Sequence, residues 1–130
     1  MQNPLKVFEY SKCSTCRKAR QWLDRHNIEY QLIPVRDTPP TPAEFSLMLE
    51  SLGGNIRKMI NTSSQDYRDA GLKERIDSMA HAEIFALLRG NGNLVKRPFV
   101  LGRGIALTGF REAEWDDAFR KHGLIHPGNR

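Results

Sequence analysis

The hydrophobic period changes twice within the first 35 residues, and this change limits the folds that the chain can adopt. Residues 5–10 alternate apolar and polar side chains, which is typical of a short β-strand. Residues 14–25 carry apolar side chains on one helical face, and residues 30–35 predict a second strand. A strand, a helix and a strand in this order predict a parallel strand pair with the helix packed across the sheet.

The middle of the chain predicts helices. Residues 41–44 have the form of a capping box, with threonine at the N-cap, proline next and glutamate three residues on. The glycines at 53 and 54 end the helix that this box starts. Residues 56–60 form a short apolar segment, and further helices are predicted at residues 66–70 and 78–89.

The C-terminal third returns to the period of a strand. Residues 99–101 and 105–107 predict an antiparallel hairpin around a tight turn at residues 102–104. Residues 112–121 predict a final helix, and the tail from His126 looks loose.

The order of these elements and the length of 130 residues predict a single α/β domain, residues 1–130. Its sheet is expected to be mixed, because a parallel strand–helix–strand unit is followed by an antiparallel C-terminal hairpin. The helices at about residues 41–89 form an insertion between these halves. No stretch is long and apolar enough for a membrane helix, and residues 1–6 lack the pattern of a secretion signal. We therefore expect a cytoplasmic protein without a membrane partner.

The charge balance is mildly basic, with 20 lysines and arginines against 15 acidic residues and a net charge of +5. Such an excess suits an anionic substrate or an acidic protein partner. The sequence has no polybasic tail and no RNA- or DNA-binding signature. Direct nucleic-acid binding is therefore not expected.

The chain contains two cysteines, Cys13 and Cys16, separated by two residues. A lone close pair in a cytosolic protein indicates either redox chemistry or metal binding. A zinc site needs more ligands, and the four histidines are scattered without ligand spacing, at positions 26, 81, 122 and 126. The pair therefore predicts a redox centre, with no metal and no bound cofactor.

The position of Cys13 favours its thiolate. It precedes the predicted helix, where free backbone N–H groups and the positive end of the helix dipole stabilise an anion. Lys12 and Arg17 add positive charge, and Ser14 with Thr15 completes the loop. Because the thiolate is the nucleophile, Cys13 is predicted to attack and Cys16, one turn later, to resolve the mixed disulfide. The same loop is a candidate anion-binding site.

Three groups of motifs resemble the ArsC/Spx family over residues 6–119. They are residues 10–19, the Asn-Thr-Ser loop at 61–63 followed by residues 67–72, and Lys-Arg-Pro at 96–98 with the later Gly109, Phe110 and Trp115. The resemblance implies a thioredoxin-like fold with a helical insertion. It also implies a cis peptide bond at Pro98 that faces the cysteine loop, with Arg97 directed to the pocket of Cys13.

One branch of this family consists of arsenate reductases, in which one cysteine attacks arsenate and three arginines bind it. This chain resembles them at Cys13 and Arg97. The Asn-Thr-Ser loop and Thr108-Gly109 stand where the other two arginines would lie, and Cys16 replaces a serine. These departures count against arsenate as the substrate, because a multiply charged oxyanion needs several charge-assisted contacts. The resemblance therefore implies an arsenate reductase-like thiol–disulfide oxidoreductase that acts on a small-molecule or thiol substrate, with glutathione, glutaredoxin or thioredoxin as reductant.

The other branch consists of Spx-like transcription regulators, which also have the two spaced cysteines. In that branch the cysteine pair is a redox switch and the partner is RNA polymerase. Gly53 and Gly54 lie near the glycine that such regulators use at the polymerase contact, although the end of a helix already explains two glycines. A redox-sensing regulator is thus the alternative function.

Overall fold

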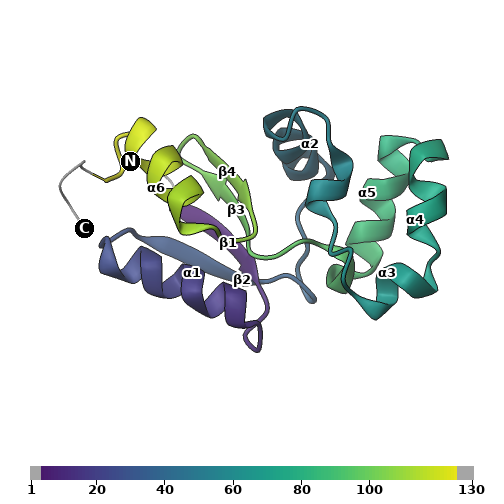
Figure 1. The fold of residues 1–130 in the computed structure, drawn as a ribbon, viewed down its shortest axis with the longest axis horizontal. Coiled ribbons are helices and arrows are strands. Elements are labelled where there is room, and N and C mark those ends of the chain that lie inside the picture. The colour runs from purple at the N-terminus through teal and green to yellow at the C-terminus, as the bar shows by residue number, and fades with distance from the viewer. Residues whose placement is uncertain (1–3, 126–130) are drawn as a thin grey trace.

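The structure is a computed structural model that describes residues 4–125 (Figure 1). In chain order its elements are β1 (Leu5–Glu9), α1 (Ser14–Arg25), β2 (Tyr30–Pro34), α2 (Pro42–Ser51), the 3₁₀ helix η1 (Ile56–Met59), α3 (Gln65–Asp69), α4 (Leu72–Arg75), η2 (Ile76–Ser78), α5 (His81–Gly90), η3 (Gly92–Leu94), β3 (Phe99–Gly102), β4 (Ile105–Thr108) and α6 (Glu112–Lys121). No helix within residues 4–125 combines the length and the apolar character needed to cross a membrane.

The four strands form one mixed sheet in the order β2-β1-β3-β4. Strand β1 is parallel to β2 and antiparallel to β3, and β3 and β4 form a hairpin. Val7 at the centre of β1 lies opposite Leu32 on one side and Val100 on the other. This topology confirms the predicted thioredoxin-like mixed sheet with a helical segment between its halves.

Two hydrophobic clusters cover the two faces of the sheet. Alternate residues of β1 divide between them, so that Val7 packs with α1 and α6 while Phe8 packs with the helices between β2 and β3. On the α1 and α6 side, the rings of Trp22, Trp115 and Phe119 lie within 5.5 Å of one another, centroid to centroid. Figure 1 shows α3, α4 and α5 grouped beyond one end of the sheet, away from α1 and α6.

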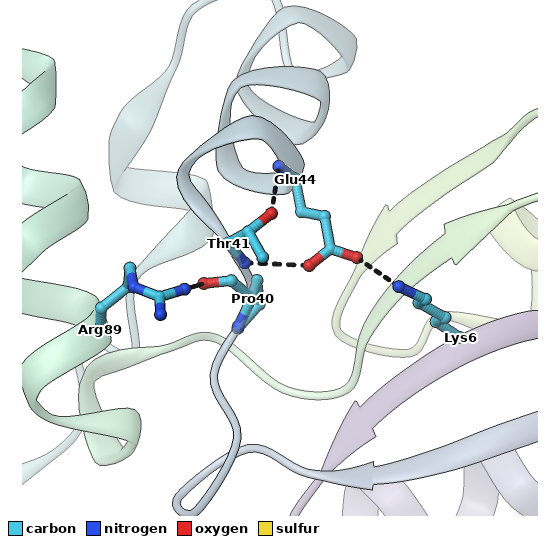
Figure 2. Close-up of polar contacts among 5 residues, drawn as sticks. All are labelled: Lys6, Pro40, Thr41, Glu44 and Arg89. Atoms are coloured by element: carbon cyan, nitrogen blue, oxygen red, sulfur yellow. Dashed lines mark hydrogen bonds and ion pairs between the residues drawn. The ribbon is translucent and has the colours of Figure 1, made fainter.

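The start of α2 is fastened to both neighbouring parts of the fold (Figure 2). The Thr41 hydroxyl accepts a hydrogen bond from the Glu44 N–H at 3.2 Å, and the Glu44 carboxylate accepts one from the Thr41 N–H at 2.9 Å. The other Glu44 carboxylate oxygen accepts a hydrogen bond from the Lys6 ammonium of β1 at 3.0 Å. Arg89 of α5 donates to the Pro40 carbonyl at 2.9 Å. The predicted capping box therefore exists and also joins the sheet to the helical segment.

Some predicted boundaries were wrong. The helix expected at residues 78–89 is α5, which begins at His81, because residues 76–78 form a 3₁₀ turn and the Ala80 N–H donates to the Glu83 carboxylate instead. Helix α4 was not predicted. The first two strands each end one residue earlier than expected, at Glu9 and Pro34.

The hairpin turn is also tighter than predicted. Gly102 belongs to β3, which leaves Arg103 and Gly104 as the turn, with φ angles of 54° and 86°. Two consecutive positive φ angles are the signature of a type I′ turn, which matches the twist of a hairpin. The predicted loose tail from His126 lies outside the described residues.

Candidate active site

Cys13 is the N-cap of α1, as the sequence predicted. Its backbone is extended, and its N–H donates to the Tyr10 carbonyl at 3.0 Å, which closes the short turn after β1. Its sulfur accepts a hydrogen bond from the Cys16 N–H at 3.4 Å. A sulfur in this position satisfies one of the free N–H groups at a helix start, a role that suits an anion best.

The two thiols differ in exposure and in acidity. Both are free; Cys13 is half-buried, and Cys16 is fully buried. Partial burial of Cys13 opposes ionisation, but hydrogen bonds from the Cys16 thiol and N–H and the charge of Arg97 outweigh it, so the pKa of Cys13 lies below its ordinary value. Burial raises the pKa of Cys16 to about 12. The pair is therefore divided into an accessible, acidic thiol and a protected, weakly acidic one.

Arg97 is held next to Cys13 by the segment before β3. The Arg97–Pro98 peptide bond is cis, as the family resemblance implied. The guanidinium lies 5.2 Å from the centre of the Tyr10 ring, and Arg36 lies over the same ring at 4.9 Å. One terminal nitrogen of Arg97, Nη1, is buried and has no hydrogen-bond partner among the described residues. A buried unpaired donor next to a nucleophile is a natural contact for an anionic ligand.

Cys13 and Arg97 open into a cleft of about 750 Å³. The cleft is lined by residues from the α1 loop, the η1 region, the segment before β3 and the start of α6. These residues are Cys13, Thr15, Leu52, Arg57, Lys58, Ile60, Asn61, Thr62, Lys96, Arg97, Thr108, Gly109, Phe110, Arg111 and Glu114.

Of the residues that the sequence suggested for the site, Cys13, Thr15 and Arg97 line this cleft. The others do not. Cys16 lies buried behind Cys13, Pro98 is buried in the chain segment that carries Arg97, and three more side chains, those of Lys12, Ser14 and Arg17, are exposed outside it.

Sequence reasoning missed the basic residues that η1 and the start of α6 contribute to the cleft. Arg57 and Lys58 lie on η1, and Arg111 is the N-cap of α6. Long-range contacts bring these walls together: Ile60 forms a β-bridge with Val95, and the Thr108 hydroxyl donates to the Lys58 carbonyl at 2.9 Å. The Asn-Thr-Ser loop and Thr108-Gly109, singled out for the arginines they lack, were the available signal for this wall.

Arg97 offers a direct test of what sets the acidity of Cys13. Replacing Arg97 with glutamine removes the nearby positive charge, so we expect the pKa of Cys13 to rise and its alkylation at neutral pH to slow several-fold. The measurement is the rate of iodoacetamide labelling as a function of pH. The matched control is Arg36→Gln, since Arg36 stacks on the same ring but does not line the cleft. If the pH midpoint of labelling were the same in Arg97→Gln as in the parent protein, Arg97 would not be what lowers the pKa of Cys13.

This chain is similar in sequence to known proteins over most of its length. The sequence model of the ArsC family matches residues 8–118. The uncharacterized protein YusI of Bacillus subtilis is 35% identical over 113 residues, covering 87% of this chain and 96% of YusI. The global transcriptional regulator Spx of Staphylococcus haemolyticus is 29% identical, covering 83% of this chain and 81% of Spx.

This chain is also similar in fold to solved structures. A crystal structure of a possible arsenate reductase from Streptococcus mutans superimposes with a TM-score of 0.78 at 36% identity, covering 86% of this chain and 97% of that one.

Proposed function

Since this chain belongs to the ArsC family, we propose that it is an arsenate reductase-like thiol–disulfide oxidoreductase whose nucleophile is Cys13. The observation that carries the proposal is the division of the cysteine pair. The accessible sulfur lies at a helix N-terminus beside Arg97 and is made more acidic, whereas its neighbour is buried and kept protonated. Two inert, structural cysteines are not expected to differ in exposure and acidity in this way.

The reaction follows from this arrangement. The Cys13 thiolate attacks one sulfur of a substrate disulfide, a new S–S bond forms, and the substrate's own S–S bond breaks. The leaving thiolate takes a proton from water. Cys16 then gives its proton to water and its sulfur attacks the Cys13 sulfur. The bond between Cys13 and the substrate sulfur breaks, the released thiolate takes a proton from water, and a Cys13–Cys16 disulfide remains. A thiol donor such as glutathione, glutaredoxin or thioredoxin reduces that disulfide by two electrons and restores the pair.

The resemblance in sequence favours a disulfide over arsenate as the substrate. The family's arsenate reductases bind arsenate with three arginines, because a multiply charged oxyanion needs several charge-assisted contacts. This chain matches one of them, Arg97, and has Asn61 and Thr108-Gly109 where the resemblance places the other two. A leaving thiolate carries one negative charge, which the Arg97 guanidinium beside Cys13 can balance.

The relative Spx supports a second candidate, a redox-sensing regulator that binds RNA polymerase. In that case the Cys13–Cys16 disulfide would be a signal instead of a catalytic intermediate. Its formation would remove the hydrogen bond from the Cys16 N–H to the Cys13 sulfur that caps α1, and so alter the start of the helix.

A coupled assay separates the two candidates. The purified protein is supplied with NADPH and either the glutathione–glutaredoxin or the thioredoxin system, and with a small neutral disulfide or arsenate as substrate. With the disulfide, we expect the protein to raise the rate of NADPH oxidation above that of the donor system alone. With arsenate, we expect a much smaller increase. Reversible formation of the Cys13–Cys16 disulfide without turnover would contradict the enzyme and favour the regulator. A polymerase pull-down with the reduced and oxidised protein would then test that function.

A further inference from the structure

Tyr10 contacts each of the three groups that make up the candidate active site. Its carbonyl accepts the Cys13 N–H at 3.0 Å, and its backbone also hydrogen-bonds the Cys16 side chain. Its half-buried ring lies against Arg97, with 5.2 Å between the ring centre and the guanidinium carbon. The turn after β1 therefore connects the attacking thiol, the resolving thiol and the cation through one residue.

The position of the Arg97 guanidinium needs an explanation, because no carboxylate holds it. It forms no salt bridge with any residue of 4–125, and its buried Nη1 has no hydrogen-bond partner there. An arginine side chain has several rotatable bonds, so an unheld guanidinium would spend much of its time away from Cys13. An aromatic ring can hold a guanidinium in another way, since the planar cation stacks on the ring face and is attracted to it.

The sheet topology places the Tyr10 ring where it can do this. Strand β1 lies between β2 and β3, so the residue after β1 is close to both the segment that leaves β2 and the segment that enters β3. Arg36 comes from the first segment and Arg97 from the second, and their guanidiniums lie 4.9 Å and 5.2 Å from the same ring centre. The attraction of each cation to the ring offsets part of the repulsion between the two like charges.

The other charged and titratable groups around Cys13 do not stack on this ring. They are Cys16 on α1, Arg57 and Lys58 on η1, Lys96 before β3, and Arg111 and Glu114 at the start of α6. Among residues 4–125, the cations over the Tyr10 ring are Arg36 and Arg97. An apolar replacement of the ring would therefore keep every charge around Cys13 and change how Arg97 is held.

We propose that Tyr10 is a positioning residue whose ring holds the Arg97 guanidinium against the Cys13 sulfur. This inference rests on the proposed function, because it names what places the cation of the same site. Partial burial opposes the ionisation of Cys13, and the charge of Arg97 is one of the contributions that outweigh it and lower the pKa. A guanidinium released from the ring is at the sulfur for less of the time, so it stabilises the thiolate less.

The test measures the acidity of Cys13 in variants that change the ring and no charge. The rate of iodoacetamide labelling of Cys13 is followed against pH. Tyr10→Leu is expected to raise the pH midpoint and to slow labelling at neutral pH by roughly 3-fold. Tyr10→Phe keeps the ring and is expected to retain the parent midpoint. Tyr10→Met is a second non-aromatic variant with the same expected result as Tyr10→Leu, and circular dichroism shows which of them keep the fold.

A double variant shows whether the ring acts through Arg97. In an Arg97→Gln background, Tyr10→Leu is expected to cause no further change in the midpoint, because the charge that the ring holds is absent. An equal rise in both backgrounds would overturn the inference. So would an unchanged midpoint in folded Tyr10→Leu or Tyr10→Met, or the same rise in Tyr10→Phe as in Tyr10→Leu.

The outcome of this test is separate from that of the coupled assay. Labelling by iodoacetamide needs neither a disulfide substrate nor turnover. An absence of turnover in the coupled assay would count against the enzyme, and the expected labelling pattern would still support the role of Tyr10. Normal turnover with no effect of Tyr10→Leu on the midpoint would support the enzyme and overturn the role of Tyr10.

Discussion

Cys13→Ser is expected to abolish disulfide reduction, with a loss of at least about a thousandfold in turnover. A serine hydroxyl at the N-cap can still accept the Cys16 N–H, so α1 keeps its start. It does not ionise near neutral pH, however, and cannot displace a thiolate from a disulfide. The measurement is the coupled NADPH assay, with circular dichroism to verify that the fold is retained.

Cys16→Ser is the companion variant and has a different expected result. Cys13 still attacks, but the resolving thiol is missing, so a mixed disulfide accumulates and is detected by intact mass. Equal residual turnover in the two single variants would contradict the separate roles. In the unmodified protein, alkylation at neutral pH is expected at Cys13 first, because Cys16 is buried and its pKa is raised to about 12.

Gly92→Ala is expected to lower the free energy of unfolding by about 3 kcal/mol. A Cβ at this position would lie 2.3 Å from the Val35 carbonyl oxygen and 2.6 Å from the Arg36 Cα. Both are backbone atoms of the segment that leaves β2, so neither can turn away as a side chain can. The substitution forces η3 away from the end of β2, and chemical denaturation measures the cost.

Gly90→Ala is the control for this prediction. Gly90 is two residues earlier, at the end of α5, and a Cβ there would meet nothing within 4 Å. Alanine is favoured over glycine in a helix, so this variant is expected to be neutral or slightly more stable. If both variants lost the same stability, the close approach at Gly92 would not be the cause.

The sequence predicted the elements whose signal is local. Residues 14–25 were expected as a helix with Cys13 just before it, and α1 has these bounds. The capping box at Thr41 and Glu44 was read directly from residue types at fixed spacing. The βαβ unit and the hairpin were likewise visible in the hydrophobic period. All of these depend on interactions within a few residues, which is why one sequence suffices to find them.

The rest of the site depends on contacts between distant segments. The wall that carries Lys58 is placed by the bridge between Ile60 and Val95 and by the Thr108 hydroxyl, about 50 residues away along the chain. No period or short motif in residues 56–60 indicates these partners. Arg111 was missed for the same reason. An arginine at the start of a surface helix gives no sign of a site, and only the fold shows that this one lines the cleft. The family resemblance located Arg97, but the residues themselves did not.

The division of the hydrophobic residues into two clusters has a consequence for the movements of the protein. Ile60 on one wall of the cleft belongs to the cluster of the middle helices, whereas Phe110 on the other wall packs against the cluster of α1 and α6. The two clusters share strands β1 and β3, but the helices on the two faces of the sheet can open locally, each at its own rate of amide hydrogen exchange. A ligand that touches both walls contacts residues of both clusters. We therefore expect a bound ligand to slow amide exchange in the helices on both faces of the sheet together, for as long as the cleft is filled.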